Sequence, residues 1–395
     1  MSHYDKNHYV QCRLLKNFAQ QNKNGNNVIC VLNLINFAAY YAKPENAFCE
    51  NNLYDVEFAN NNKDLELKFK TNIEDPMGTL LNKIDNDSAP TFTFTRAELE
   101  TIKKYILLQI YRTPHNKKSY TNIPDNTFEL SQFNINQNES KVDFWKREML
   151  TILDSDWDSL LETDMIGIRK NALEINSSFL MFIKTADEFC INDLGYCTER
   201  IPIKIPEDQQ DDFIKNAKII GQMLYGKDDF DEIAKKEIAD ESSYIDNYIL
   251  FPISSNIAIL VVSPLWKQYL LHPELRHKGI PFHSLLLQNH LSIPMTTYKN
   301  ADKIKNDADI ITYKSPEDQY IYQLHTMSCE ETIYLNHLTI NEAFCYIGLK
   351  TPDKFLKTIR EYNFLASMKT QNIKKNLLGY VELLSKLIKT NHWNK

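Results

Sequence analysis

The sequence predicts an α+β protein, with a mixed or antiparallel sheet, flanking helices and a helical C-terminal segment. Two observations predict this class. Apolar runs of strand length, such as Ser178–Ile183 and Ile257–Val262, stand among segments whose apolar residues recur every three or four positions. Beyond residue 325 the helical pattern predominates, and these last helices are expected to close the fold against the sheet.

The N-terminal half begins with a short helix or extended segment at His8–Gln20. The turn-forming stretch NKNGNN then leads into a strand at Val28–Leu34. From Asp75 the pattern is helical, and RAELETIKKYILLQIYRTP predicts a long amphipathic helix that ends at Pro114, because proline interrupts helical hydrogen bonding. A polar loop at about 119–140 and a helix at about 142–161 are expected to follow.

The second half begins with the strands SFLMFIKT and RIPIKIP and a helix near Asp211–Tyr225. The runs DNYILFPIS and NIAILVVS predict a hairpin that turns at Ser255 and Asn256. Pro252 lacks a backbone N–H group, so it predicts a free or bulged edge on the first of these strands. Three helices are expected near 329–346, 352–361 and 372–389.

The chain length of 395 residues exceeds the usual size of a single hydrophobic core. We expect an N-terminal α+β lobe with long amphipathic helices at 1–171 and a sheet-containing lobe with the C-terminal helices at 172–395. One continuous domain is the alternative.

Composition and charge restrict the class of protein. The formal net charge of -7 provides no global field for nucleic acid, so such a partner would need a local basic patch. Seven scattered cysteines do not resemble a disulfide framework and favour a reducing cytoplasm. No apolar run reaches the roughly 18 to 20 residues that span a bilayer, and the N-terminus lacks the apolar core of a signal peptide. We therefore predict a cytoplasmic protein without membrane insertion.

The segment HYVQCRLLKNFA at residues 8–19 begins a series of motifs. The later ones are AFCENNLYDVEF, LLQIYRTP, KTADEF, FPISSNIAI and LNHLTINEAFCYIG. Together they resemble the bacterial DUF4238 family, whose members open with His-Tyr-Val-Pro-Gln, an aromatic residue and Leu-Arg-Asn-Phe. The residues that match or are close are His8, Tyr9, Val10, Leu15, Lys16, Asn17 and Phe18, whereas Gln11, Cys12, Arg13 and Leu14 depart from the pattern. The family also has Asn-Pro where this chain has Glu188 and Phe189.

His8 and Asp187 are the predicted catalytic residues. The ordinary pKa of imidazole suits proton transfer near neutral pH, so His8 is a candidate general acid or base. Asp187 follows the apolar run FLMFIKT, and strand ends commonly carry functional groups. A packing role for His8 and a turn-capping role for Asp187 are the structural alternatives.

Gln109, Arg112 and Asn336 are the predicted substrate-binding residues. Arg112 suits bidentate recognition of phosphate or carboxylate, and Gln109 lies three residues earlier on the same helical face. As alternatives, Arg112 would interact with the helix dipole and the last carbonyl groups, and Asn336 would satisfy buried backbone groups.

No metal site is predicted. Four histidines stand in HPELRHKGIPFHSLLLQNH, namely His272, His277, His283 and His290. Their spacings match neither a helical zinc pair at i and i+4 nor a zinc finger. The sequence assigns no cofactor and no oligomeric state.

Two functional hypotheses follow. The first is a bacterial enzyme, a nuclease or nucleotide-processing hydrolase that acts on a nucleic acid or nucleotide. Arg112 and Gln109 would hold the phosphate, His8 would transfer protons, and Asp187 would either orient His8 or bind a divalent metal ion. The resemblance implies a role in antiviral defence or as a toxin effector. The second hypothesis is a non-catalytic sensor or partner-binding protein, in which the motif residues form a buried polar network and surface loops contact a protein partner.

Overall fold

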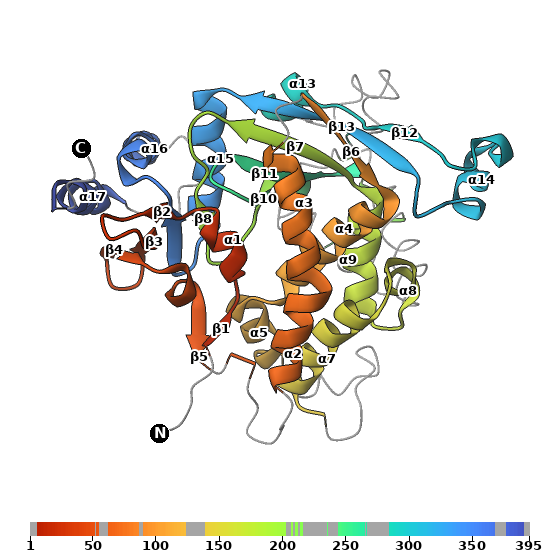
Figure 1. Ribbon diagram of the computed structural model, residues 1–395, viewed down its shortest axis with the longest axis horizontal. Coiled ribbons are helices and arrows are strands. Elements are labelled where there is room, and N and C mark those ends of the chain that lie inside the picture. Colours follow the sequence, from red (N-terminus) through yellow and green to blue (C-terminus); the bar gives the residue numbers. More distant parts are fainter. Residues whose placement is uncertain are drawn as a thin grey trace.

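Two β-sheets, one of seven strands and one of five, organise the protein (Figure 1). The structure is a computed structural model that describes residues 6–51, 53–54, 62–86, 90–123, 139–202, 244–264, 284–367 and 377–390, together with the isolated positions 207, 210, 211, 214, 215, 235 and 266. It confirms an α+β fold with a mixed sheet and C-terminal helices.

The larger sheet has seven strands in the order β12-β13-β7-β11-β10-β9, and β6 also pairs with β13. Their bounds are β6 Thr91–Thr95, β7 Phe179–Thr185, β9 Cys197–Pro202, β10 Tyr244–Pro252, β11 Ile257–Val262, β12 Met295–Thr297 and β13 Gln319–Met327. The pair β13 and β7 is parallel, whereas the other pairs are antiparallel. Every residue of β11 is buried, because helices or strands cover both faces of this central strand.

The smaller sheet has the order β2-β3-β14-β8, and β4 also pairs with β3. Its strands are β2 Gln20–Gln21, β3 Asn27–Asn33, β4 Ala38–Ala42, β8 Ile191–Asn192 and β14 Tyr346–Leu349. The two remaining strands, β1 Lys6–His8 and β5 Cys49–Asn51, form a separate antiparallel ribbon. This ribbon lies next to the smaller sheet and carries His8.

The first group of helices belongs to the N-terminal half of the chain. They are α1 Cys12–Lys16, α2 Asn62–Lys68, a π-helical turn Phe69–Glu74, α3 Asp75–Asn86, α4 Arg96–Tyr111, α5 Pro114–Thr121, α7 Lys141–Asp154, α8 Trp157–Glu162 and α9 Ile166–Ser177. The later helices are α13 Leu285–His290, α14 Asp307–Thr312, α15 Cys329–Glu342, α16 Pro352–Ser367 and α17 Leu378–Thr390. Short 3-10 turns occur at Pro44–Asn46 and Ala301–Lys303. No helix within the described residues combines the length and apolar character needed to cross a bilayer.

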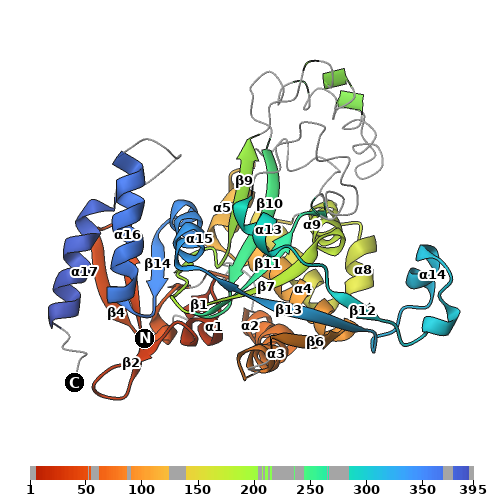
Figure 2. The same cartoon turned by 90° about the horizontal axis from the view of Figure 1, so that it is seen from above.

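Two apolar clusters hold these elements together. The main cluster joins the larger sheet to α3, α4, α7 and α9, and the rings of Phe92, Phe182 and Tyr322 meet edge to face or stacked inside it. The second cluster lies between the smaller sheet and the helices α16 and α17. Figure 2 shows these two helices outermost at one end of the molecule and α14 outermost at the other.

The predicted hairpin is confirmed. β10 and β11 pair antiparallel from Tyr248 opposite Val262 to Pro252 opposite Ala258. On the other side of β10 the pairing with β9 stops at Leu250, so Pro252 has a free edge there. The same pair shifts register between Asp246 and Tyr248, which is the bulge of this strand.

Three predicted element boundaries are wrong. The helix expected at 142–161 is divided in two, because Asp156 caps α8 by accepting the Ser159 N–H at 2.7 Å. The helix expected at 329–346 ends at Glu342, and Tyr346 begins the strand β14. The loop expected at 119–140 begins inside α5. The helix expected near 211–225 lies largely outside the described residues.

The larger and the smaller sheet each combine strands from the two halves of the chain. β6 pairs with β13, and β3 pairs with β14. Residue 171, where we placed the boundary between two lobes, lies within α9. The division into lobes at 1–171 and 172–395 stays a prediction.

Gly348 tests how tightly the smaller sheet is packed. A Cβ atom at this position would lie 2.8 Å from Ile29 Cδ1 and 2.9 Å from Ile191 Cγ2. We expect Gly348→Ala to lower the free energy of unfolding by about 1–3 kcal/mol through overpacking, measured by urea denaturation. The exposed strand variant Thr91→Ala should change it by less than about 0.5 kcal/mol. Equal free energies of unfolding for the two variants would contradict the tight packing at Gly348.

Candidate functional site

Arg112 is buried at the end of α4 and contacts the N-terminal motif. Its side chain is 1% exposed. Nε donates to the His8 carbonyl oxygen at 2.7 Å and to the Tyr54 hydroxyl at 3.1 Å, and Nη1 donates to Glu74 Oε1 at 2.7 Å. The guanidinium carbon also lies 4.3 Å from the centre of the Phe69 ring. The charge is therefore matched by a carboxylate and by oriented dipoles inside the protein.

Gln109 holds two other segments together. Its Nε2 donates to the Tyr9 carbonyl at 2.9 Å and to the Leu194 carbonyl at 2.8 Å, while its Oε1 is buried without a partner among the described residues. Gly195 has a φ of +76°, and a Cβ atom there would lie 2.8 Å from Gln109 Nε2. Glycine is thus required for both the left-handed turn and the close approach of the amide.

The His8 side chain lies beside this network. Burial first, and then the charge of Arg112, lower the pKa of the imidazole, so the neutral form is favoured. Its Nε2 is buried and has no hydrogen-bond partner among the residues that the structure describes. His8, Gln109 and Arg112 thus lie close together, whereas the first hypothesis also assigned Asp187 to this site.

Asp187 and Asn336 lie together in a different place. Asn336 Nδ2 donates to the Glu188 carbonyl at 2.9 Å, and its Oδ1 accepts the Cys190 N–H at 2.9 Å. The Asp187 N–H donates to Thr185 Oγ1 at 3.0 Å, and the Asp187 carbonyl accepts Asn256 Nδ2 at 3.1 Å. No hydrogen bond or ion pair in the described part of the chain joins this pair to the group around Arg112.

The contacts of the five predicted residues are mostly with backbone groups. Gln109 and Asn336 bind main-chain atoms, as the structural alternative for Asn336 anticipated. The hydrogen bonds of the Arg112 side chain go to His8, Tyr54 and Glu74 and not to the last carbonyl groups of α4. The catalytic and substrate-binding roles stay predictions.

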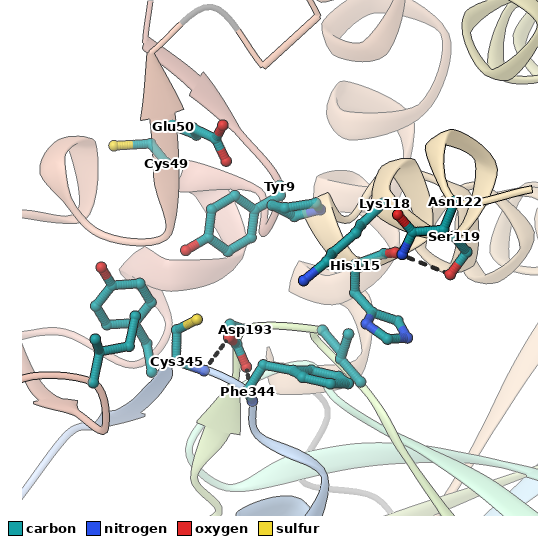
Figure 3. Close-up of a pocket in the computed structure, with 14 residues that line it drawn as sticks. Tyr9, Cys49, Glu50, His115, Lys118, Ser119, Asn122, Asp193, Phe344 and Cys345 are labelled. Carbon is teal, nitrogen blue, oxygen red and sulfur yellow. Dashed lines mark hydrogen bonds between the residues drawn. The ribbon is translucent and has the colours of Figure 1, made fainter. Parts of the chain in front are cut away.

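A pocket of about 550 Å³ opens between α5, the N-terminal ribbon and the smaller sheet (Figure 3). None of the five predicted residues lines it. The lining residues come from segments far apart in the sequence and are Tyr9, Ile35, Cys49, Glu50, Pro114, His115, Lys118, Ser119, Asn122, Asp193, Leu194, Phe344, Cys345 and Tyr346. Sequence reasoning missed this site, because its residues meet only in the folded chain.

One wall of the pocket is a single face of α5. Thr113 caps this helix by accepting the Asn116 N–H at 3.1 Å, and Pro114 occupies its first turn. The spacing i, i+3, i+4 and i+7 then places four polar side chains on one face, namely His115, Lys118, Ser119 and Asn122. The Ser119 hydroxyl donates to the His115 carbonyl at 3.1 Å, so the other three are the donors of this face toward the pocket. In Figure 3 the Lys118 side chain extends from this helix toward the middle of the cavity.

Contacts on its far side hold α5 in place. Tyr120 donates its hydroxyl hydrogen to the Glu148 carboxylate, and Lys117 Nζ donates to the Leu53 carbonyl at 2.6 Å. Neither contact uses the pocket face, and the contact of Tyr120 anchors the helix to α7. The Thr-Pro pair at the start of α5 was the one sequence signal that could have revealed this helix.

Asp193 shapes the opposite side of the pocket. Its two carboxylate oxygens accept the backbone N–H groups of Phe344 at 2.8 Å and Cys345 at 2.6 Å. The Phe344 ring then stacks on the His115 ring, with centroids 4.1 Å apart and an interplanar angle of 22°. The carboxylate thus fixes the chain that enters β14 and positions an aromatic surface at the pocket.

Burial and the charge of Asp193 influence the protonation of groups that line the pocket. Burial first, and then the negative charge of Asp193, raise the pKa of both the Tyr9 phenol and the Cys345 thiol. Burial also raises the pKa of the Cys49 thiol. All three groups are therefore protonated near neutral pH and do not supply a thiolate or phenolate nucleophile.

No group of three or more His, Cys, Asp or Glu residues suited to a metal ion occurs within the described ranges. Of the four histidines that we considered at the sequence level, only His290 lies in those ranges, and its Nε2 contacts Glu331 Oε1 at 2.8 Å. The other three, His272, His277 and His283, lie outside them.

Fold and pocket together define an α+β protein with a cavity of ligand size. Residues 6–351 match the family model described as "Protein of unknown function (DUF4238)". The match covers most of the chain, so the protein belongs to this family, as its motifs predicted. No curated protein and no solved structure matches the chain significantly.

Arg112 is expected to be essential for stability. Removing its charge in Arg112→Met leaves the half-buried Glu74 without this partner, and the His8 carbonyl keeps only the longer hydrogen bond from the Tyr54 hydroxyl at 3.2 Å. We expect a loss of about 3–5 kcal/mol in the free energy of unfolding, measured by urea denaturation. The control is Arg13→Met, because Arg13 forms an exposed ion pair with Asp75 at 3.3 Å and should contribute less than about 1 kcal/mol. Similar losses for both variants would contradict the structural role of Arg112.

Glu148 is expected to make stability depend on pH. Burial raises the pKa of this carboxyl group to about 7 from its ordinary 4.5. The folded state therefore binds more protons than the unfolded state between these values, and the free energy of unfolding falls as the pH rises from about 4.5 to about 7. In Glu148→Gln this fall should be smaller, measured by thermal unfolding at a series of pH values. The exposed variant Glu162→Gln should retain the wild-type profile, and a profile unchanged in Glu148→Gln would show that this carboxyl group is not the source.

Proposed function

We propose that the protein binds a small phosphorylated molecule with an apolar ring, such as a nucleotide, in the pocket beside α5. The observation that carries this proposal is the row of three donors on one helical face, at His115, Lys118 and Asn122. An ammonium group, an imidazole and an amide suit an anionic group with several acceptor oxygens. The volume of about 550 Å³ is typical of pockets for small molecules.

The other walls suit an apolar body. Tyr9, Tyr346 and the half-exposed Phe344 present ring surfaces, and Ile35 adds an aliphatic side chain that is 70% exposed. The aromatic face of a base would cover these side chains while the phosphate contacts α5, because aromatic walls with a few placed polar groups are typical of ligand sites. The ligand would therefore lie across the cavity, from α5 to the start of β14.

The two carboxylates of the pocket are compatible with an anionic ligand on the α5 side. Both oxygens of Asp193 already accept backbone N–H groups, so part of its charge is compensated. Glu50 is exposed and lies on β5, across the cavity from the donor face. The phosphate is accordingly placed at Lys118 and not at the centre of the pocket.

Binding without covalent catalysis is the role that these groups support best. The Cys345 thiol and the Tyr9 phenol stay protonated near neutral pH, which favours the sensor hypothesis over an enzyme with a nucleophile in this pocket. A sensor of this kind in bacterial antiviral defence would respond to a nucleotide through α5 and the start of β14. A hydrolase would use His115, which is the imidazole that lines the cavity.

A thermal-shift titration with graded ligands tests the proposal. The panel is inorganic phosphate, ribose 5-phosphate, AMP and, as a carboxylate control, succinate. We expect AMP to raise the unfolding temperature most, because ligands stabilise the native state that they bind. Lys118→Met should weaken AMP binding about tenfold or more, since a hydrogen bond to a charged group contributes about 1.5–3 kcal/mol.

The control variant is Lys386→Met on α17, whose lysine forms an exposed ion pair with Glu382 at 2.7 Å. It should bind AMP as the wild type does. A panel in which no phosphorylated member shifts the wild type, or in which Lys118→Met and the wild type respond equally, would refute the proposal.

A further inference from the structure

A serine and a histidine meet outside the pocket, at the end of the larger sheet. Ser292 follows α13, and His325 lies near the end of β13. Ser292 Oγ is 2.7 Å from His325 Nε2, a hydrogen bond in which the hydroxyl can donate to the neutral ring. A hydroxyl within this distance of an imidazole is the geometry in which histidine activates serine as a nucleophile.

A second histidine supports the first. The His290 ring lies against the His325 ring, with centroids 5.8 Å apart and an interplanar angle of 65°. Glu331, in the first turn of α15, holds His290 through the 2.8 Å contact to Nε2. The His325 ring is thus bounded on one side by Ser292 and on another by an imidazole that is itself fixed.

The surroundings keep His325 able to accept a proton. His325 is 9% exposed, and burial first and then the charge of His290 lower the pKa of its imidazole. A histidine that is neutral near pH 7 is the form that acts as a general base. The same burial restricts the ring, whereas Ser292 is only half-buried and can be reached from solvent.

Two apolar side chains follow the serine and are open to solvent. Ile293 is 39% exposed and Met295 is 71% exposed, although both are large hydrophobic residues. Apolar side chains beside a nucleophile suit an apolar acyl group, because covering them removes apolar surface from water.

We propose that Ser292 and His325 form a nucleophilic centre that cleaves carboxylic esters with an apolar acyl group, independently of the ligand pocket beside α5. Ser292 Oγ would attack the ester carbonyl carbon while its proton passes to His325 Nε2. The alcohol then leaves with that proton, and an acyl ester on Ser292 remains. Water hydrolyses this ester, with His325 again accepting and returning one proton, so that acid and free serine are formed.

Labelling with an alkyl fluorophosphonate tests the centre directly, because this reagent phosphonylates activated serines and releases fluoride. Peptide mass spectrometry of the full chain gives the rate at each serine. We expect Ser292 to react at least tenfold faster than the half-buried Ser315, whose Oγ accepts the Glu317 N–H and serves as the reference. His325→Gln should slow labelling of Ser292 by about 100-fold, as is typical for loss of a general base.

A p-nitrophenyl ester series of increasing acyl length provides the second measurement. Hydrolysis should increase from acetate to hexanoate and be lost in Ser292→Ala, a variant that removes one hydroxyl and should remain folded. Equal reactivity of Ser292 and Ser315 in the wild type, or ester hydrolysis that persists in Ser292→Ala, would overturn the proposal.

His290 is assigned a positioning role, and a pH profile separates this role from a merely structural one. The labelling rate of Ser292 should rise with pH as His325 loses its proton. In His290→Gln the midpoint should move to higher pH, because the charge that lowers the pKa of His325 is removed. If the pH midpoint of Ser292 labelling were the same in His290→Gln as in the wild type, the assignment would be contradicted.

Discussion

The buried guanidinium of Arg112 is the interaction on which the rest of the candidate site depends. An arginine with 1% exposure is tolerated only if its charge and its donors are matched, and here Glu74, Tyr54 and the His8 carbonyl provide the match. Removing the guanidinium would leave the Glu74 carboxylate without this partner and the His8 carbonyl with only the hydrogen bond from Tyr54. The contact therefore fixes the N-terminal ribbon against the end of α4.

The pocket follows from that attachment. Gln109, one turn before Arg112, donates to the Tyr9 carbonyl and to the Leu194 carbonyl. Tyr9 and Leu194 both line the pocket, so α4 holds two of its lining residues in place. Immediately after Arg112 the Thr113 cap and Pro114 end one helix and begin the next. This change of direction presents the donor face of α5 to the cavity. The segment 109–114 thus fixes Tyr9 and Leu194 on one side of the pocket and α5 on another.

The sequence identified much of the fold because its signals were local. The hairpin of β10 and β11 was predicted from two apolar runs and a polar turn, and the free edge at Pro252 from the missing N–H group. The strand β14 was missed, because four residues, Tyr346–Leu349, follow a helix closely and are too few to show a strand period. The break at Asp156 was missed because one capping residue interrupts an otherwise helical pattern.

The candidate site was only partly predictable for a related reason. The motif residues His8, Gln109 and Arg112 lie close together, but the side chains that bind the guanidinium, Glu74 and Tyr54, lie 38 and 58 residues away from Arg112 in the chain. Contacts of this kind are set by tertiary packing and leave no periodic pattern. His115, Lys118 and Asp193 were not predicted either, because each looks like an ordinary polar residue until α5 and β14 face one another.

The rate of thiol alkylation tests the central claim, that a phosphorylated ligand occupies the pocket beside α5. Cys49 and Cys345 line the cavity and are half-buried, and Cys329 is half-buried but lies on α15, outside the lining. We would measure iodoacetamide labelling of each thiol by peptide mass spectrometry, with and without AMP. The proposal predicts that AMP slows labelling of Cys345 and Cys49 and leaves Cys329 unchanged. Equal rates at all three thiols with and without AMP, under conditions that saturate any thermal shift, would contradict it.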